Sequence, residues 1–296
     1  MIKAAYNLAH ERDCLTAFHP PITCSKPSLY NHGVIFASPH SGRIYPEGFL
    51  AQSILPLRIL RQNEDAYMDD MIAPVIDHDI PVLTANFPRC FVDVNRAPDE
   101  VLAQWSDTPN RQPTQRAKLG LGVIPTVMSE TQAIYSSVPP VDIVKPRLDA
   151  LYRPYHSALK GLIEQALTSC GQALIIDCHS MPGVSLSGRQ RADIILGDRF
   201  ATSAHETYVA LIEDHFQTYG YRVARNYPYA GGYVTSHYGR PNEDIHVIQI
   251  EVNRGLYLNP VTYERKVGFS DLQTCFTALG QTLKHAFGHK QLRAAE

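Results

Sequence analysis

The sequence lacks the features that mark membrane, secreted and nucleic-acid-binding proteins. No apolar run approaches the roughly 20 residues that a membrane-spanning helix needs. The formal net charge is −2, so strong electrostatic attraction to nucleic acid or to an anionic membrane is not expected. The opening residues, MIKAAYNLAHERDCL, carry charges where a secretory signal has its apolar stretch. We therefore expect a cytoplasmic protein with neither a membrane nor a nucleic acid as its partner.

Several enzyme motifs are missing as well. There is no Gly-x-Gly-x-x-Gly and no Gly-x-x-x-x-Gly-Lys-Ser/Thr, so nucleotide binding has no support. The absence of Gly-x-Ser-x-Gly weakens a serine hydrolase. The six cysteines include no Cys-x-x-Cys pair, which favours reduced thiols over a disulfide scaffold or a thiolate zinc site. The remaining composition, 44% hydrophobic and 19% charged, is that of an ordinary globular protein and fits an enzyme.

Apolar runs alternate with stretches of helical periodicity along the chain. We expect strands in the runs at 33–42, 80–86, 90–95, 173–180, 192–198, 221–225 and 246–253. We expect helices over 52–77, 141–170, 200–218 and 261–287. This alternation predicts an α/β fold with a mixed, largely parallel central sheet flanked by helices.

The expected organisation is one domain over 1–296, with residues 1–30 as a loop-rich lead-in. Pro154 should kink the helix of 141–170. The polar, Pro-rich segment 100–140 reads as an excursion over the active face, with no further role assigned. The sequence does not predict an oligomeric state.

Polar residues collect where the expected strands end. His40 follows the first strand, and similar residues follow three others: Asp93, Asn95 and Arg96; Asp177 and His179; Glu251, Asn253 and Arg254. In open α/β sheets, ligands bind beyond the carboxyl ends of the strands. We therefore expect these side chains to form one site.

These residue types indicate a particular chemistry. Two histidines and a carboxylate are a usual catalytic zinc set, with a fourth position left for water. A carboxylate outside that set can deprotonate the water, and arginines can hold an acidic substrate or stabilise an oxyanion. The residues therefore predict metal-assisted hydrolysis of an acyl bond in a small acid.

Three features remain ambiguous at this level. Asp177 is either a metal ligand or a partner that orients His179. Glu64 and Asp65 stand in the middle of a predicted helix, where a solvated face is the ordinary interpretation. The Gly231–Gly232 pair fits both a plain turn and a loop that approaches a ligand closely.

Five stretches resemble the N-formylglutamate amidohydrolase family. In chain order they are FASPHSGRIYP, RCFVDVNRAPDE, IIDCHSMPG, RNYPYAGGYVTSHYGRP and IQIEVNRGLYL, and the resemblance covers roughly residues 33–260. It implies a zinc-carboxypeptidase-like α/β fold. It also implies hydrolysis of N-formyl-L-glutamate to formate and L-glutamate, a late step of histidine breakdown.

The resemblance also implies a metal site. His40 and His179 match the family's metal histidines. Asp65 is the better match to the family's acidic position, with Glu64 as its competitor, because the local context NEDAY departs from the family pattern. The implied cofactor is one divalent metal, with zinc expected and cobalt or manganese as alternatives.

Further roles follow from the same resemblance. Glu251 corresponds to the carboxylate that activates water in carboxypeptidase-like enzymes, and Arg89 to a group that stabilises the acyl oxygen. Asn95 and Arg96 correspond to a pair that holds a substrate carboxylate. Arg225 and Tyr229 are additional candidate substrate contacts. Arg254 is a weaker candidate for a substrate contact, because a structural ion pair is an equally good interpretation.

Two stretches, Asp-Val-Asn-Arg at 93–96 and Glu-Val-Asn-Arg at 251–254, are nearly identical. We interpret them as different parts of one site, the first for substrate anchoring and the second for the general base. Three alternative functions remain: hydrolysis of another N-acyl amino acid, carboxypeptidase activity, and binding of an acidic metabolite without catalysis. In each case the partner is a small molecule.

Overall fold

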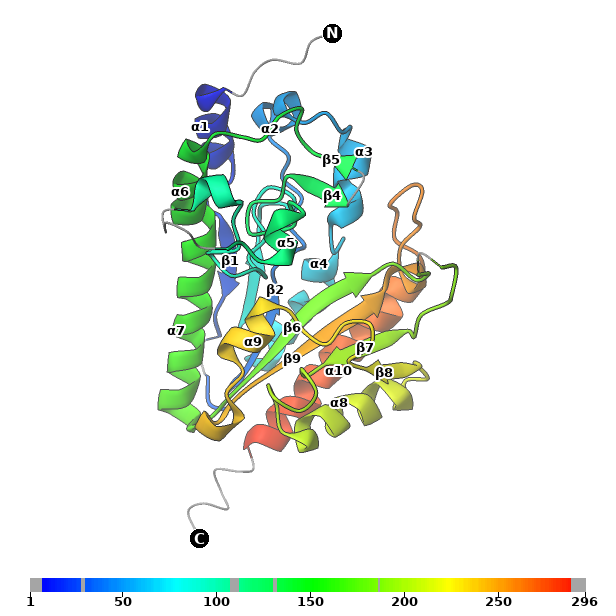
Figure 1. Ribbon diagram of the computed structural model, residues 1–296. Helices are drawn as coiled ribbons and strands as arrows, with labels where there is room; N and C mark the ends of the chain where they lie inside the picture. Colours follow the sequence, from blue (N-terminus) through cyan, green and yellow to red (C-terminus); the bar gives the residue numbers. More distant parts are fainter. Residues whose placement is uncertain (1–6, 28–29, 107–111, 130–131, 186, 289–296) are drawn as a thin grey trace. The chain divides into compact units, whose positions relative to one another are not determined.

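The computed structural model describes residues 7–27, 30–106, 112–129, 132–185 and 187–288. Its main feature is a seven-stranded sheet in the order β1-β3-β2-β6-β9-β7-β8 (Figure 1). The strands are β1 (Ile22–Ser25), β2 (Val34–Ser38), β3 (Val82–Ala85), β6 (Ala173–Met181), β7 (Ile194–Gly197), β8 (Val223–Arg225) and β9 (Ile245–Asn253). β2, β6 and β9 are parallel neighbours, and β7 runs antiparallel to β9. The predicted mixed, largely parallel sheet is therefore confirmed.

The chain divides into two compact units. Unit 1 comprises Met1–Thr23, Pro39–Glu64 and Thr84–Ala158, and unit 2 comprises Cys24–Ser38, Asp65–Leu83 and Leu159–Glu296. Unit 2 contains most of the sheet and the helices α4 (Met68–Ile72), α8 (Glu206–Thr218), α9 (Tyr233–Tyr238) and α10 (Gly268–Gly288). Unit 1 contains α1 (Leu8–Ala17), α2 (Glu47–Gln52), α3 (Leu57–Leu60), α5 (Gln115–Lys118), α6 (Val144–Arg147) and the hairpin of β4 (Val127–Ser129) and β5 (Gln132–Ala133).

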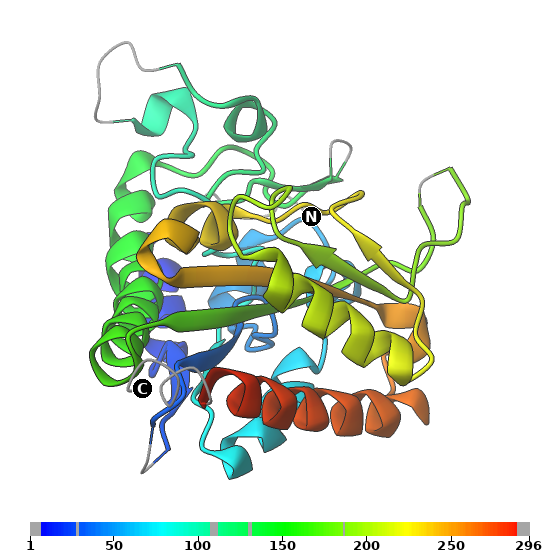
Figure 2. The same ribbon diagram turned by 90° about the horizontal axis from the view of Figure 1, so that it is seen from below.

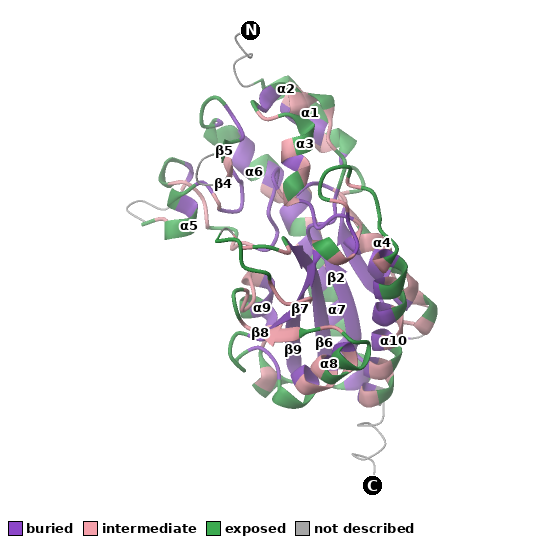
Figure 3. Ribbon diagram, turned by 90° about the vertical axis from the view of Figure 1, so that its right-hand side faces the viewer, coloured by how far each residue is buried: buried purple, intermediate pink, exposed green. Residues whose placement is uncertain are grey.

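In the central strands of unit 2, even-numbered and odd-numbered side chains lie on opposite faces of the sheet. Successive residues of a strand point to opposite faces of the sheet. The even-numbered apolar residues of β2, β6 and β9 join one core cluster with α4, α8 and α10: Val34, Phe36, Leu174, Ile176, Cys178, Ile248, Ile250 and Val252. Figure 2 shows α8 and α10 lying side by side along this face, and Figure 3 shows these strands buried. The odd-numbered residues point to the other face.

Unit 1 is organised around a buried arginine. Arg147, which is 0% exposed, donates to both carboxylate oxygens of Glu11 in α1, at 2.6 and 2.8 Å. Its guanidinium carbon lies 3.6 Å from the ring centroid of Phe91, and that ring also contacts Phe18 and Phe49. A buried charge is tolerated only when it is paired and hydrogen-bonded, and Arg147 meets both conditions.

Several predicted elements differ in the structure. The strand predicted at 90–95 is wrong, because these residues form buried turns. The single helix predicted over 52–77 is also wrong. It is replaced by α2, α3, α4 and short 3₁₀ turns, so Glu64 and Asp65 lie in a bend and not on a solvated helix face. Residues 1–30, expected to be rich in loops, contain α1 and β1.

Two later elements also differ from the prediction. The helix α9, between the strands at 221–225 and 246–253, was not predicted. The last helix begins at Gly268, later than the predicted 261. None of the helices in the described part of the chain is long and apolar enough to cross a membrane.

The predicted helix of 141–170 is nearly continuous, and Pro154 does not break it. A 3₁₀ turn and α6 lead into a π-turn over Leu148–Tyr152, and α7 (Arg153–Cys170) follows directly. Proline has no N–H for the regular helical bond and its ring clashes with the preceding turn. The wider π-turn, which ends at Tyr152, accommodates Pro154 at the start of α7.

Candidate active site

The odd face of the sheet in unit 2 carries the polar residues of β6 and β9. Asp177 and His179 lie on β6, and Gln249, Glu251 and Asn253 lie on β9, all at most 7% exposed. The strand register places His179 directly opposite Glu251. The predicted metal histidine and the predicted general base are therefore neighbours on one face.

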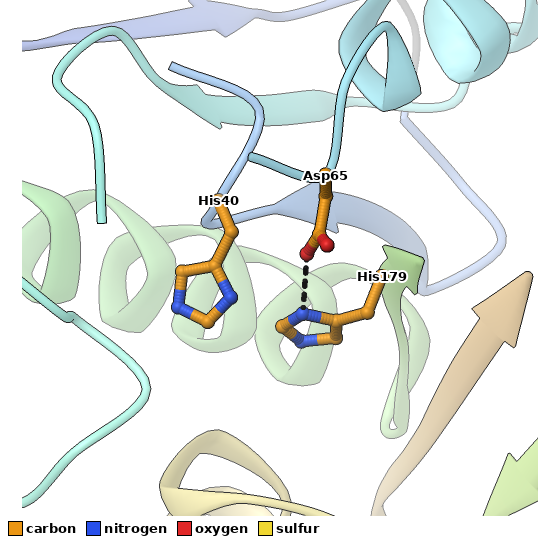
Figure 4. Close-up of side chains that lie close together, drawn as sticks. All are labelled: His40, Asp65 and His179. Carbon is orange, nitrogen blue, oxygen red and sulfur yellow. Dashed lines mark hydrogen bonds and ion pairs between the residues drawn. The ribbon is translucent and has the colours of Figure 1, made fainter. Parts of the chain in front are cut away.

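His179 lies between two carboxylates. Its Nε2 is 2.9 Å from Asp177 Oδ2, and its Nδ1 is 3.0 Å from Asp65 Oδ2. Figure 4 marks the interaction with Asp65 by a dashed line. Burial alone would lower the pKa of His179, but the two carboxylates raise this pKa well above its usual range. The contact with Asp177 fits one of the two roles predicted for this residue, that of a partner that orients His179.

Asp65 is held from its other side by Ser180 and Arg254. Ser180 Oγ donates to Asp65 Oδ1 at 2.9 Å and accepts from Arg254 Nε at 2.9 Å. Arg254 Nη2 lies 3.4 Å from Asp65 Oδ1 and donates to the Ser180 carbonyl at 3.2 Å. The ion-pair interpretation of Arg254 is therefore confirmed, and its partner is the predicted third ligand.

Glu251 is oriented by its own strand. Gln249 Nε2 donates to Glu251 Oε1 at 2.9 Å, and Gln249 Oε1 accepts from the Gly232 N–H at 2.8 Å. Sequence reasoning missed both Gln249 and Ser180. The signal for Gln249 was a polar residue in phase with Glu251 within an otherwise apolar strand, where burial requires hydrogen-bond partners. The Gly231–Gly232 pair thus belongs to a loop whose amide reaches this chain of hydrogen bonds.

In unit 1, the Asp93 carboxylate contacts the predicted site residues of that unit: His40, Arg89, Asn95 and Arg96. Its Oδ1 is 2.7 Å from His40 Nε2 and accepts from the Asn95 N–H at 2.9 Å. Its Oδ2 accepts from Arg89 Nη2 at 2.8 Å and lies 3.7 Å from Arg96 Nη2. Burial alone would raise the pKa of Asp93, but Arg89, Arg96 and then His40 hold it well below its usual range.

The two histidines share one pattern, each within its own unit. His40 uses Nε2 to contact Asp93, and His179 uses Nε2 to contact Asp177. Metal-binding histidines commonly use one ring nitrogen for such a partner, which leaves the other nitrogen to face the ion. By this rule Nδ1 is the candidate ligand atom of both residues.

A sequence model of the N-formylglutamate amidohydrolase family matches residues 32–258. The chain belongs to this family. Every residue predicted for the site lies inside the matched range.

Individual relatives agree. The chain is 26% identical to an N-formylglutamate deformylase of Pseudomonas putida and 24% identical to one of Pseudomonas aeruginosa; the alignments cover 62% and 60% of this chain and 67% and 64% of the relatives. Its sequence is 32% identical to that of an N-formylglutamate amidohydrolase from Ralstonia eutropha, whose crystal structure is known. The two structures align with a TM-score of 0.84 over 91% of this chain and 99% of that one. A protein from Agrobacterium tumefaciens, 15% identical with a TM-score of 0.63 over 92% and 96% of the two chains, shares the fold.

Glu64 and Arg225, two residues considered for the amidohydrolase site, form ion pairs with neighbouring residues. Glu64 accepts from Arg61 Nε at 3.0 Å, whereas Asp65 contacts His179, which favours Asp65 as the ligand. Arg225 donates from Nε to Glu213 at 2.7 Å and from Nη1 to Glu206 at 2.6 Å, both on α8. Its guanidinium is therefore engaged in ion pairs, while its role as a substrate contact stays a prediction.

Tyr229 is half-buried and lies near Arg191, whose guanidinium carbon is 5.3 Å from the ring centroid. Burial raises the pKa of Tyr229, with Glu251 and Asp65 acting in the same direction against Arg191 and Arg254. The phenol therefore stays protonated at neutral pH and can donate a hydrogen bond. Its role as a substrate contact also stays a prediction.

Proposed function

We propose that the protein hydrolyses N-formyl-L-glutamate to formate and L-glutamate. The observation that carries this proposal is the family match over residues 32–258, which includes every residue assigned a role. Its support within the structure is the placement of Glu251 opposite His179 on adjacent parallel strands, where a base and a metal ligand would serve the same water. The neighbouring hydrogen bonds orient both side chains.

The metal part of the proposal assigns His40, Asp65 and His179 as ligands, the three residues that the family resemblance implies. These three residues are a group that could hold a metal ion, and all are at most 2% exposed. Two imidazoles and one carboxylate fit a catalytic divalent cation, with zinc as the expected ion. When bound, such a cation would polarise the formyl oxygen and acidify a water.

The remaining steps are assigned to side chains of this chain. Glu251 takes a proton from the attacking water and returns it to the leaving nitrogen, so that the amine departs neutral. Arg89 stabilises the developing oxyanion. Asn95 and Arg96 hold a substrate carboxylate. This last role is supported by charge, because Asp93, Arg89 and Arg96 together carry one net positive charge.

The test is formate release from N-formyl-L-glutamate by the purified protein, with metal content measured on the same sample. We expect release with about one metal per chain, loss of release after chelation, and recovery when zinc or cobalt is added. Release of another acyl group, but not of formate, from a panel of N-formyl and N-acetyl amino acids would change the substrate. Absence of bound metal with full activity would overturn the metal assignment.

A further inference from the structure

The buried turn that carries Asp93, Asn95 and Arg96 is not part of any strand, so no sheet supplies its backbone hydrogen bonds. Residues Phe91–Asn95 are at most 4% exposed. A buried carbonyl without a partner costs free energy comparable to a lost hydrogen bond. The carbonyls of this turn must therefore find donors elsewhere in unit 1.

Three side chains from one helical run supply those donors. Arg147 Nη1 donates to the Phe91 carbonyl at 3.1 Å, and His156 Nε2 donates to the Val94 carbonyl at 2.9 Å. Tyr152 Oη donates to the Arg96 carbonyl at 2.9 Å. The rings of Tyr152 and His156 also contact each other, with centroids 4.2 Å apart. The donors thus span the turn from one end to the other.

The π-turn explains why these three residues reach the same segment. Tyr152 and His156 are four positions apart, so they share a face of a regular helix. Arg147 and Tyr152 are five positions apart and would not share that face in an α-helix. Over Leu148–Tyr152 the bonding changes to five residues, and the Arg153 N–H bonds to the Leu148 carbonyl. The extra residue per turn brings Arg147 into line with the other two.

We propose that Tyr152 and His156 are positioning residues for substrate binding: they fix the backbone of the 91–96 turn and thereby aim Asn95 and Arg96 at the substrate carboxylate. This inference rests on the proposed function. Arg147 holds the first carbonyl of the same turn, but it also bonds Glu11 in the core. Tyr152 and His156 therefore offer the cleaner test.

The first variant is Tyr152→Phe, which removes the hydroxyl and keeps the ring. We expect KM for N-formyl-L-glutamate to rise about tenfold with kcat within about twofold, because the turn loosens while the chemical groups remain. His156→Ala should act in the same direction. His156→Gln should recover most of the loss, because its amide can donate to the Val94 carbonyl. The matched control is Tyr219→Phe, an exposed tyrosine that should leave both constants unchanged.

A merely structural role would give a different pattern. It would lower the thermal midpoint and the active fraction with KM unchanged, and the His156→Gln variant would not recover. Either result with active wild-type protein would overturn the positioning role and leave the proposed function intact.

Calorimetry with L-glutamate separates the two proposals. If the wild type releases no formate yet binds L-glutamate, weaker binding by Tyr152→Phe still supports the positioning role. If the wild type neither releases formate nor binds, the proposed function fails and the positioning role fails with it.

Discussion

Residues 93–96 and 251–254 differ in sequence only by Asp for Glu, yet the molecule builds them in two ways. In the first stretch, Asp93 contacts His40, Arg89 and the Asn95 N–H from within a turn of unit 1. In the second, Glu251 lies within a nine-residue strand, two residues before its end, and accepts a hydrogen bond from Gln249 two positions earlier. The first acid is surrounded by cationic partners, and the second has an amide as its neighbour along the strand.

Because their surroundings differ, the two carboxylates are suited to different chemical roles. A carboxylate neutralised by two guanidiniums is a poor base, because the charges that lower its pKa also weaken its hold on a proton. It is suited to arranging those guanidiniums. Glu251 is oriented by the neutral amide of Gln249, which fits the role of general base that is proposed for it. The other residues of the two stretches differ as well. Asn95 and Arg96 are proposed to hold the substrate, whereas Asn253 and Arg254 make structural contacts.

Exchanging each acid for its amide should produce the largest separation between the stretches. Glu251→Gln removes the proposed base without changing the side-chain shape, and we expect kcat to fall at least about 1,000-fold. Asp93→Asn should lower kcat/KM about 10- to 100-fold through misplacement of His40 and Arg89. Steady-state kinetics on both variants measure the difference.

Metal content is the control for this pair. Glu251→Gln should keep its metal, whereas His179→Ala should lose it, as measured by elemental analysis of the purified proteins. Near-normal turnover by Glu251→Gln would remove Glu251 from the mechanism. Unchanged metal occupancy in His179→Ala would remove His179 from the ligand set.

The arginines should separate next. Arg254→Lys breaks the paired contacts to Ser180 and leaves Asp65 less firmly held, so we expect the affinity for zinc to fall about tenfold. Arg96→Lys should instead raise KM about tenfold with zinc affinity unchanged. Competition with a chromophoric chelator measures the zinc affinity. Equal effects of both variants on KM and on zinc would end the distinction between the two arginines.

The asparagines should give the smallest separation in kinetics. Asn253 Oδ1 accepts from the Gly255 N–H at 2.9 Å and caps the turn after β9, so Asn253→Ala should cost about 1 kcal/mol of unfolding free energy with KM unchanged. Asn95→Ala should raise KM several-fold, about five- to tenfold. Urea unfolding and kinetics on the same samples test both. A rise in KM for Asn253→Ala would place Asn253 at the substrate.

Thiol chemistry should leave activity unchanged. Cys90 lies three residues before Asp93, and burial raises its pKa to about 12, while Cys178 on β6 has its pKa raised well above the usual range by burial and then by Asp177. Because a raised pKa leaves few thiolates at pH 8, iodoacetamide should not inactivate the folded protein at that pH. Rapid inactivation under these conditions would show that a thiol reaches the site.

The sequence predicted the structure correctly where the local pattern of apolar and polar residues determined which side chains are buried. The apolar runs at β2, β6 and β9 could only become buried strands, and their polar residues had to face a common side. His179 and Glu251 were therefore predictable as neighbours. The bend at Glu64–Asp65 was not predictable, because the apolar spacing over 52–77 fits a helix well, whereas Asp65 is held by tertiary contacts with His179 and Ser180, 114 and 115 positions later.

The strand predicted at 90–95 was wrong for a related reason. CFVDVN has the β-branched, alternating character of a strand, but its Phe91 and Val94 carbonyls bond to Arg147 and His156, which lie 56 and 62 residues later in the chain. Nothing local in CFVDVN signals those partners. The same limit hid Ser180, whose bonds to Asp65 and Arg254 join three distant segments.

The division of β6 and β9 into an apolar even face and a polar odd face also constrains how this sequence can change over time. Substitutions can drift at even positions, within the volume of the core, without touching the chemistry. A single inserted or deleted residue near the start of β6 is another matter. It would turn His179 into the core and Cys178 toward Glu251, and one event would destroy both the packing and the site. Length variation in this protein should therefore be confined to the loops.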